Sequence, residues 1–192
     1  MTEKEDMNQE SDAANPDAVA SRRRLLLGAG LLATATGMGA AWWLSHGAAA
    51  AVAEPVPGFW GWQWPRPEGG QLVLKTFQSQ PLLINFWATW CAPCVEELPL
   101  INDFYKKNRT NGFQVVGIAV DQAPAVQAFL KQTPLDFPLG IAGLSGAEVA
   151  RALGDLSGGL PFSLVLDRQG QVVLRKSGRL SEADLAALLG LK

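Results

Sequence analysis

Apolar residues occur in short blocks between residue 70 and the C-terminus, and polar or turn-forming residues separate these blocks. The block Leu82–Trp87 is nearly continuous, which is typical of a central strand buried on both faces. The block Phe113–Val120 has the same character. Between them the pattern predicts a helix from about Pro93 to Lys107, because proline is tolerated in the first turn of a helix. This stretch is therefore expected to form a β-α-β unit.

The pattern further along the chain predicts several more elements. Two helices are expected to begin with capping boxes, Ser145 with Glu148 and Ser181 with Asp184. The segment Asp167–Gly170 is typical of a hairpin turn. The further expected elements are strands at Gln71–Leu74, Phe162–Leu166 and Gln171–Arg175, a short extended segment at Leu135–Ile141, and helices at 124–132, Ser145–Leu153 and Ser181–Leu189. This order predicts an α/β fold with a central mixed sheet and helices on both faces.

Three tryptophans alternate along the chain before these strands, at Trp60, Trp62 and Trp64. On a strand, all three indoles would face the same way. We expect an edge strand that packs its indoles on the core, and a surface that docks a partner is the alternative. Residues 45–69 are accordingly assigned to a linker and this edge strand.

The segment from Leu25 to Leu44 contains twenty residues without a charge. As a helix it would span ~30 Å, the thickness of the hydrocarbon core of a bilayer. Trp42 and Trp43 stand at its far end, where an interfacial aromatic belt belongs. Nine of the twenty residues are Gly or Ala, and Ala51–Ala53 matches the small-x-small pattern of a signal-peptidase site. Residues 25–44 are therefore predicted to be a retained transmembrane anchor or an export signal cleaved near Ala53, with a buried helix of the domain as a third alternative.

Charge is unevenly distributed along the chain. Residues 1–20 carry six acids and one lysine, and Arg22–Arg24 add three positive charges in a segment that resembles a twin-arginine export signal. Residues 1–24 are predicted to be a disordered acidic tail with an arginine triplet. By the positive-inside rule the tail lies in the cytoplasm and everything after residue 44 lies outside it. We expect a single-pass inner-membrane protein with a periplasmic domain, or a soluble periplasmic protein if the signal is cleaved.

Composition excludes several classes of function. The 192 residues are 48% apolar and 18% charged, as expected of one globular domain with an appendage. Two cysteines, Cys91 and Cys94, can build neither a disulfide framework nor a four-thiolate zinc site. The one histidine, His46, lies before the domain, which leaves no Ser-His-Asp machinery. The net charge of −2 gives no electrostatic footprint for nucleic acid. Neither a cofactor nor a metal is expected.

Cys91 and Cys94 stand between a predicted buried strand and the start of a predicted helix. The N-terminus of a helix offers unpaired N–H groups and a partial positive charge, which stabilise a thiolate on Cys91. Cys91 is expected to be the exposed attacking thiol, and the more buried Cys94 the resolving thiol. Half of a metal site and a purely structural disulfide are the alternatives. A CxxC between a strand and a helix in an α/β pattern favours thiol–disulfide exchange.

The segment Asn85–Cys94, with the sequence NFWATWCAPC, resembles the active-site segment of the thioredoxin superfamily. Among the groups of this superfamily, the chain is similar to the TlpA/ResA-like membrane-anchored thiol–disulfide oxidoreductases. The resemblance covers about residues 70–192, which implies a thioredoxin-like domain there. Residues 121–145 correspond to the α/β insertion that this group carries.

The resemblance implies roles for individual residues. Pro161 corresponds to the superfamily's cis-proline, and Pro99 falls where the active-site helix of the family kinks. Glu97 resembles a carboxylate that ResA-like members keep near the cysteines; burial would raise its pKa and suit it to proton transfer. An exposed helix carboxylate is the alternative for Glu97, and its neighbour Glu96 is assigned to a solvated face. Asn85 occupies the place of thioredoxin's buried aspartate, so Glu97 is the remaining candidate for acid–base chemistry.

Substrate-facing positions also follow from the resemblance. Trp90, Pro93 and Leu160 are expected to face the substrate, and Phe162 stands where thioredoxin has a small polar residue. Cysteine-containing exported proteins are the implied substrates, as in cytochrome c maturation, with a membrane electron donor of the CcdA/DsbD type.

The residues between the two cysteines bear on the direction of electron flow. Ala92 and Pro93 are neutral, and the domain contains no histidine. Thiolate stabilisation then depends mainly on the helix terminus, which is worth ~0.3–1 kcal/mol at exposed sites. We therefore expect a disulfide reductase. A copper-handling or assembly protein on the same scaffold and a thiol peroxidase are the alternative functions.

Overall fold

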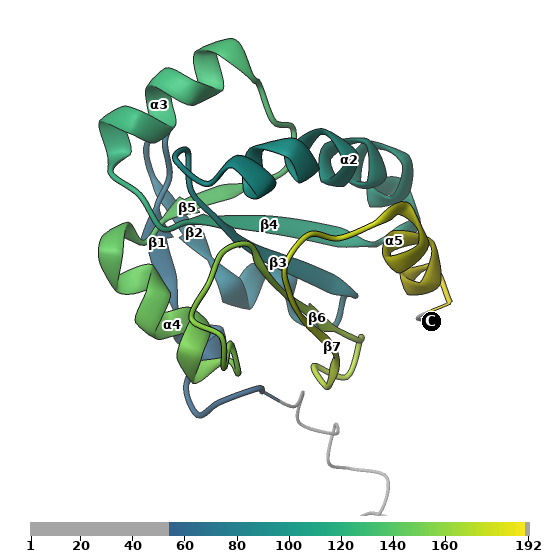
Figure 1. Cartoon of the computed structure of the whole chain (residues 1–192). Helices are drawn as coiled ribbons and strands as arrows, with labels where there is room; N and C mark the ends of the chain where they lie inside the picture. The colour runs from purple at the N-terminus through teal and green to yellow at the C-terminus, as the bar shows by residue number, and fades with distance from the viewer. Residues whose placement is uncertain (1–53, 191–192) are drawn as a thin grey trace, which may run out of the picture. The chain divides into compact units, whose positions relative to one another are not determined.

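A five-stranded mixed sheet forms the centre of the protein in the computed structural model, which describes residues 54–190 (Figure 1). The strands lie in the order β5-β4-β3-β6-β7. Around the sheet are four α-helices of the described residues: α2 (Ala92–Asn108), α3 (Ala123–Gln132), α4 (Gly146–Ala152) and α5 (Glu182–Leu188). No helix within this range is long and apolar enough to span a bilayer. The predicted tail and the predicted anchor or signal segment lie outside the described residues.

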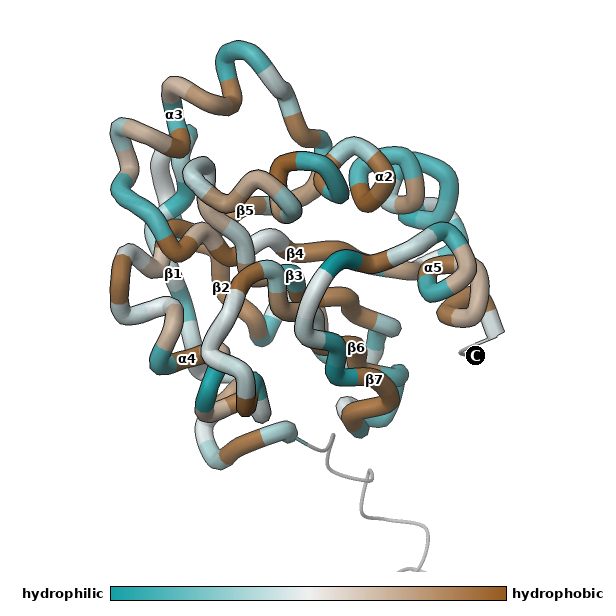
Figure 2. Tube along the Cα trace, viewed as in Figure 1, coloured by the Kyte–Doolittle hydropathy of each residue, from teal (hydrophilic) through white to brown (hydrophobic). Residues whose placement is uncertain are grey.

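The central strand is β3 (Leu82–Trp87), and all six of its residues are buried, as the continuous apolar run predicted. It pairs in parallel with β4 (Gln114–Ala119) and antiparallel with β6 (Phe162–Leu166). The short strand β5 (Leu139–Ile141) continues the sheet in parallel beside β4, and β7 (Val172–Ser177) completes it antiparallel beside β6. The mixed sheet is therefore confirmed. Figure 2 shows apolar residues along much of this centre.

Two apolar clusters cover the two faces of the sheet, as the α/β pattern predicted. One cluster includes residues of α2, the buried Val126 of α3 and the buried leucines of α5. The other includes α4 and the segments that precede β3. Successive residues of β3 alternate between the clusters, because Leu83 belongs to the first and Ile84 to the second. Helices therefore lie on both faces.

The segment before β3 differs from the prediction. Trp60 belongs to a 3-10 turn, Phe59–Gly61, whereas Trp64 lies on the short strand β1 (Gln63–Pro65), which pairs with β2 (Gln71–Val73). The single strand through all three tryptophans is therefore wrong, because the left-handed Gly58 leads into a turn. The expectation that the indoles pack on the core is confirmed, since all three contact the cluster beneath the hairpin.

The two predicted capping boxes had different outcomes. Ser181 caps α5: its Oγ accepts from the Asp184 amide, and the Asp184 carboxylate accepts from the Ser181 amide. At α4 the predicted box is wrong. Ser145 has helical backbone angles at the end of a 3-10 turn, and its hydroxyl donates to Ala142 O instead. A cap needs an extended residue at this position, and the preceding turn prevents it.

The predicted hairpin and insertion are both present in the fold. Asp167 closes the β6–β7 turn, where its Oδ1 accepts from the amides of Gln169 and Gln171. Residues 121–145 contain α3 and β5, which add a helix and an edge strand beside β4. The extended segment predicted at Leu135–Ile141 is a strand only over its last three residues.

Candidate active site

The redox pair lies where β3 leads into α2. Cys91 is the N-cap residue of α2 and has extended backbone angles, and Pro93 follows in the first turn. Proline lacks an N–H, and the first turn of a helix needs none, so the sequence favours a helix start at this point. The Cys94 amide donates to Cys91 Sγ at 3.3 Å. The sulfur of Cys91 therefore receives an N–H from the helix N-terminus, as the sequence predicted.

Cys91 and Cys94 form a disulfide, and their Cα atoms lie 5.2 Å apart. Cys91 is 6% exposed and Cys94 is fully buried. The order of accessibility matches the predicted roles, although Cys91 is less exposed than the sequence suggested. Ala92 and Pro93 are exposed between them, so the turn that joins the two cysteines faces solvent.

A carboxylate holds the loop before Cys91. Asp121 Oδ2 accepts from the Thr89 amide at 3.0 Å and from Thr89 Oγ1 at 2.5 Å, and its Oδ1 accepts from the Gln122 amide. Burial raises the pKa of Asp121, but these hydrogen bonds outweigh burial and the net shift is downward. Asp121 follows β4 and precedes α3, so it ties the active-site loop to the start of the inserted helix.

Glu97 lies in a buried polar cluster on the inner face of α2. It is 1% exposed, and it is three residues after Cys94, which places both on one face of the helix. Its Oε1 accepts from Asn85 Nδ2 at 2.8 Å, and its Oε2 accepts from the Leu180 amide at 2.7 Å. Asn85 Nδ2 also donates to Ser163 Oγ at 3.1 Å. The exposed-carboxylate alternative for Glu97 is therefore wrong.

Burial raises the pKa of Glu97 above its ordinary value of 4.5. The hydrogen bonds from Leu180 and Asn85 and the positive charges of Arg179 and Lys176 act in the opposite direction, but burial outweighs them. The sequence predicted this direction. A carboxyl group whose pKa lies closer to neutrality is better suited to accept and return a proton.

The peptide bond between Leu160 and Pro161 is cis, as the resemblance implied. Pro161 is buried at the start of β6, and its carbonyl accepts from the Gly178 amide at 2.8 Å. Leu160 packs against the cluster that contains both cysteines. The side chain of Phe162 is buried and packs on Phe86, with ring centroids 5.9 Å apart. Phe162 is therefore not part of the exposed surface that could face a substrate.

The surface beside the cysteines is apolar and exposed. Trp90 is 66% exposed, and Ala92 and Pro93 are exposed as well. Glu96 lies on the solvated face, as predicted, where it pairs with Arg179 at 2.6 Å. Pro99 lies inside α2, which continues across it. A proline there leaves the carbonyl four residues earlier without its helical hydrogen bond.

Sequence reasoning missed Ser163, Asp121 and the Leu180 amide as parts of the site. A signal existed for the first two, because each is a lone polar residue within or directly after a buried apolar strand. Leu180 contributes its backbone, which no side-chain pattern reveals, and it lies 83 positions from Glu97.

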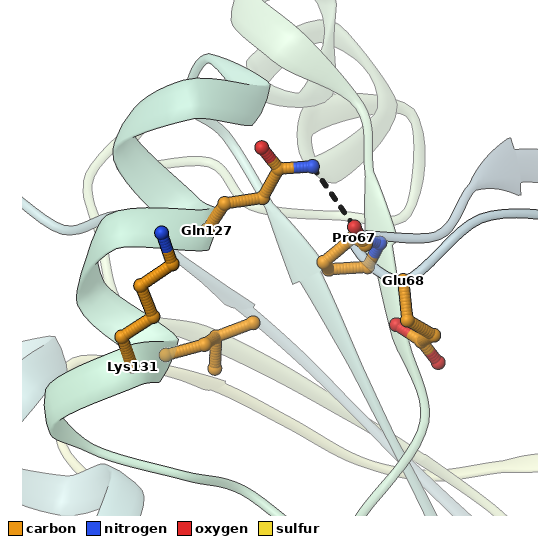
Figure 3. A pocket seen from close by; sticks show the side chains of 5 residues that line it. Pro67, Glu68, Gln127 and Lys131 are labelled. Atoms are coloured by element: carbon orange, nitrogen blue, oxygen red, sulfur yellow. Dashed lines mark hydrogen bonds between the residues drawn. The ribbon is translucent and has the colours of Figure 1, made fainter.

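A metal centre or a surface pocket would be another kind of site among the described residues. Residues 54–190 contain no group of three or more His, Cys, Asp or Glu side chains that could hold a metal ion. A surface pocket lies between α3 and the β1–β2 turn, where Gln127 Nε2 donates to Pro67 O at 2.9 Å (Figure 3). Glu68 and Lys131 line it, and neither cysteine does.

A CxxC disulfide at the start of a helix, a buried carboxyl group one turn later and a cis-proline before an adjacent strand define a thiol–disulfide oxidoreductase of the thioredoxin fold. The redoxin family model matches residues 62–189, and the chain belongs to this family.

Individual relatives agree with this assignment. The chain is 33% identical to the thiol-disulfide oxidoreductase ResA of Bacillus thuringiensis over 123 residues, which cover 64% of this chain and 69% of ResA. It is 30% identical to a thioredoxin-family thiol:disulfide interchange protein of Chlorobium tepidum, with a TM-score of 0.58 over 67% of this chain and 90% of that one. StoA of Bacillus subtilis shares the fold at 23% identity, with a TM-score of 0.55 over 67% of this chain and 95% of StoA. The chain is thus a ResA-like member of the thioredoxin superfamily.

Proposed function

We propose that this chain is a protein-disulfide reductase that acts on exported proteins outside the cytoplasm. The observation that carries the proposal is the Cys91–Cys94 pair at the N-terminus of α2, with Cys91 the more accessible sulfur. The helix terminus stabilises negative charge on that sulfur, and the thiolate is the form of cysteine that attacks disulfides.

The reaction transfers two electrons from the reduced pair to a substrate disulfide. The Cys91 thiolate attacks one substrate sulfur, forms a mixed disulfide and releases the other sulfur as a thiolate. The Cys94 thiol then loses its proton, and its sulfur attacks Cys91 Sγ. The Cys91–Cys94 bond forms, and the second substrate thiolate leaves and takes up the proton.

Glu97 is the group that moves this proton. It is buried one helical turn from Cys94, and burial raises the pKa of its carboxyl group. The carboxylate accepts the proton of the Cys94 thiol and later returns it to the departing substrate sulfur. Proton transfer by a positioned group typically contributes about 10²–10⁴-fold to a rate.

Substrate contact is assigned to the apolar surface around the cysteines. Trp90 and Pro93 are exposed beside Cys91, and Leu160 is half-buried before the cis-proline Pro161. An exposed apolar surface suits an extended or unfolded segment that presents a cysteine.

The N-terminal third of the sequence supports the proposed cellular setting. An uncharged segment at 25–44 behind three arginines suits either a retained inner-membrane anchor or a cleaved export signal. Both place the domain in the periplasm. There a membrane dithiol donor of the CcdA/DsbD type would reduce the pair again, and apocytochrome c thiols are among the substrates to test.

A trapping experiment tests the substrate role. Cys94→Ser removes the resolving sulfur, so the mixed disulfide on Cys91 accumulates in native membranes and mass spectrometry identifies its partner. Cys91→Ser, which keeps Cys94, is the matched control and should trap much less. Equal trapping by both variants, or none by either, would remove the assigned roles.

Equilibration with glutathione buffers tests the direction of electron flow. The neutral Ala92–Pro93 dipeptide adds no charge to stabilise a thiolate, and the helix terminus alone contributes ~0.3–1 kcal/mol. Because ~1.4 kcal/mol corresponds to roughly 30 mV for a two-electron couple, the potential should lie at the reducing end of the range for this fold. A potential near those of strong disulfide oxidants would overturn the reductase assignment.

A further inference from the structure

Both oxygens of the Glu97 carboxyl group face hydrogen-bond donors. Oε1 faces the amide nitrogen of Asn85, and Oε2 faces the Leu180 backbone N–H. Neither nitrogen can accept a hydrogen bond. The arrangement satisfies a carboxylate, which only accepts, and it leaves a neutral carboxylic acid without an acceptor for its own O–H. A site that is to hold Glu97 in both forms therefore has to change when the proton arrives.

The main chain is the fixed side of this site. Leu180 lies between Gly178, whose amide donates to Pro161 O at 2.8 Å, and Ser181, whose amide donates to Asp184 at 2.7 Å. Those two hydrogen bonds tie the loop to β6 and to the start of α5. The Leu180 N–H therefore keeps its direction, and Oε2 of Glu97 stays the accepting oxygen.

Asn85 is the side of the site that can turn. The two ends of its amide have opposite hydrogen-bonding character, and rotation by half a turn about the last side-chain bond exchanges them. Asn85 is fully buried, yet its Oδ1 has no hydrogen-bond partner. Its Nδ2 has two, Glu97 and Ser163.

Both partners of Asn85 Nδ2 can reverse their role. A protonated Glu97 donates, and the Ser163 hydroxyl donates or accepts according to where its hydrogen points. With the amide turned, Oδ1 of Asn85 would accept from protonated Glu97 and from the Ser163 hydroxyl. The amide nitrogen would then be the atom of Asn85 without a hydrogen-bond partner. With Glu97 ionised, the same turn would place Oδ1 against a carboxylate oxygen. The turned form is therefore favoured only while Glu97 carries a proton.

We propose that Asn85 is a positioning residue whose amide turns over each time Glu97 gains or loses its proton, so that Glu97 keeps a hydrogen bond in both states. This inference rests on the proton role of Glu97 in the proposed function. Thioredoxin has a buried acid at the position of Asn85. In this chain the residue at that position does not titrate but orients the Glu97 carboxyl group.

Other charged groups face Glu97 and are held by partners of their own. Arg179 and Lys176 act on it electrostatically from β7 and the loop that follows. Arg179 pairs with Glu96, and Lys176 pairs with Asp184. Because the pKa of Asp184 is lowered to about 2, that pair stays intact over the range in which Glu97 titrates.

Nuclear magnetic resonance of the full-length chain in a neutral detergent tests the proposal. The probes are the side-chain amide of Asn85 and the carboxyl carbon of Glu97, followed upward from below pH 4.5, the ordinary pKa of a glutamate. Both should titrate with one midpoint. Above it, Asn85 amide protons should show Overhauser contacts to Ser163 and Glu97, and below it these contacts should disappear. Contacts that persist while the Glu97 carbon titrates would overturn the proposal.

Glu97→Gln supplies a second test that needs no titration. The carbonyl of the new glutamine amide has to face the Leu180 N–H, so its NH₂ group faces Asn85. This NH₂ group can only donate, so it needs the Oδ1 atom of Asn85 as its acceptor. The Asn85 amide should therefore be turned at every pH in this variant. Ser163→Ala is the matched control: it leaves Glu97 to direct the amide, and the turnover with pH should remain.

The same samples separate this inference from the proposed function. If disulfide exchange slows in Glu97→Gln while the Asn85 amide keeps one orientation throughout, the proton role of Glu97 stands and the turning amide is wrong. If the Asn85 amide of the wild type turns with pH while exchange is unchanged in Glu97→Gln, Glu97 has no proton role in the exchange reaction, whereas the coupling of the amide to the titration of Glu97 stands.

Discussion

Glu96 and Glu97 are neighbours with opposite environments. Glu96 is exposed and pairs with Arg179, whereas Glu97 is buried with Asn85 and the Leu180 amide. One position along a helix turns a side chain by about 100°, since the helix has 3.6 residues per turn. Glu97 thereby lies on the face of Cys94, and Glu96 faces solvent. The chemistry of the site depends on which of the two carboxylates faces inward.

The buried Glu97 predicts a particular pH dependence of stability. Its pKa is raised in the folded state, so folding favours the protonated form. The stability of the wild type relative to Glu97→Gln should therefore be highest below pH 4.5 and should fall as pH rises through the folded-state pKa. Urea unfolding of both oxidised proteins over a pH series measures the difference. A difference that is constant, or that grows with pH, would contradict a raised pKa of Glu97 in the folded state.

At the scale of elements, the inserted segment and the active-site loop share one carboxylate. Asp121 stands between β4 and α3, and it holds Thr89 through both the backbone amide and the hydroxyl. The insertion is therefore connected directly to the turn that carries Cys91. Asp121 therefore links the start of α3 to Thr89, which lies two residues before Cys91.

Thr89→Val should loosen this connection. The substitution keeps the shape of the side chain and removes the hydroxyl donor to Asp121. A hydrogen bond to a charged group contributes about 1.5–3 kcal/mol, and the partial exposure of Thr89 places the expected loss at the lower end. Thr89→Ser, which keeps the donor, should stay close to the wild type in chemical denaturation. Faster hydrogen exchange at the amides near Cys91 is expected only for valine. Equal behaviour of the two variants would show that the hydroxyl contributes nothing.

Asp184, at the start of α5, should make the stability of the fold depend on pH in the acid range. Hydrogen bonds from Lys176 and Ser181 lower the pKa of Asp184 from 3.8 to about 2. A lowered pKa means that the contribution to stability is present above pH 3.8 and is lost as pH falls through about 2. Asp184→Asn should therefore be less stable than the wild type near neutral pH and should match it at the acid end. Thermal unfolding across this range, in low salt, checks it; a deficit that persists in strong acid would point to a different cause.

At the scale of the whole molecule, local signals predicted most of the fold. The continuous apolar run of β3, the proline at the start of α2 and the Ser181 cap each act within a few residues, and each was confirmed. The same holds for the CxxC position. Ser145 failed as a cap because a preceding 3-10 turn fixes its backbone, which side-chain types do not encode.

The sequence pattern could not predict which distant residues contact one another in the site. Glu97 receives a backbone N–H from Leu180, and Asn85 meets Ser163 across 78 positions. These contacts exist because β3 and β6 pair in one register, with Asn85 opposite Ser163. Such a register follows from the packing of the whole sheet. The burial of Glu97 could be suspected from the sequence, but its partners could not be named.

The bridge between Cys91 and Cys94 closes a loop of very few residues within one turn of a helix. Closing so small a ring restricts an unfolded chain less than the ~3 kcal/mol associated with a 15-residue loop. Two apolar clusters cover both faces of the sheet and join elements far from the bridge. The bond can therefore open without the loss of a major cross-link of the fold, which suits a disulfide that is broken and formed again in every turnover.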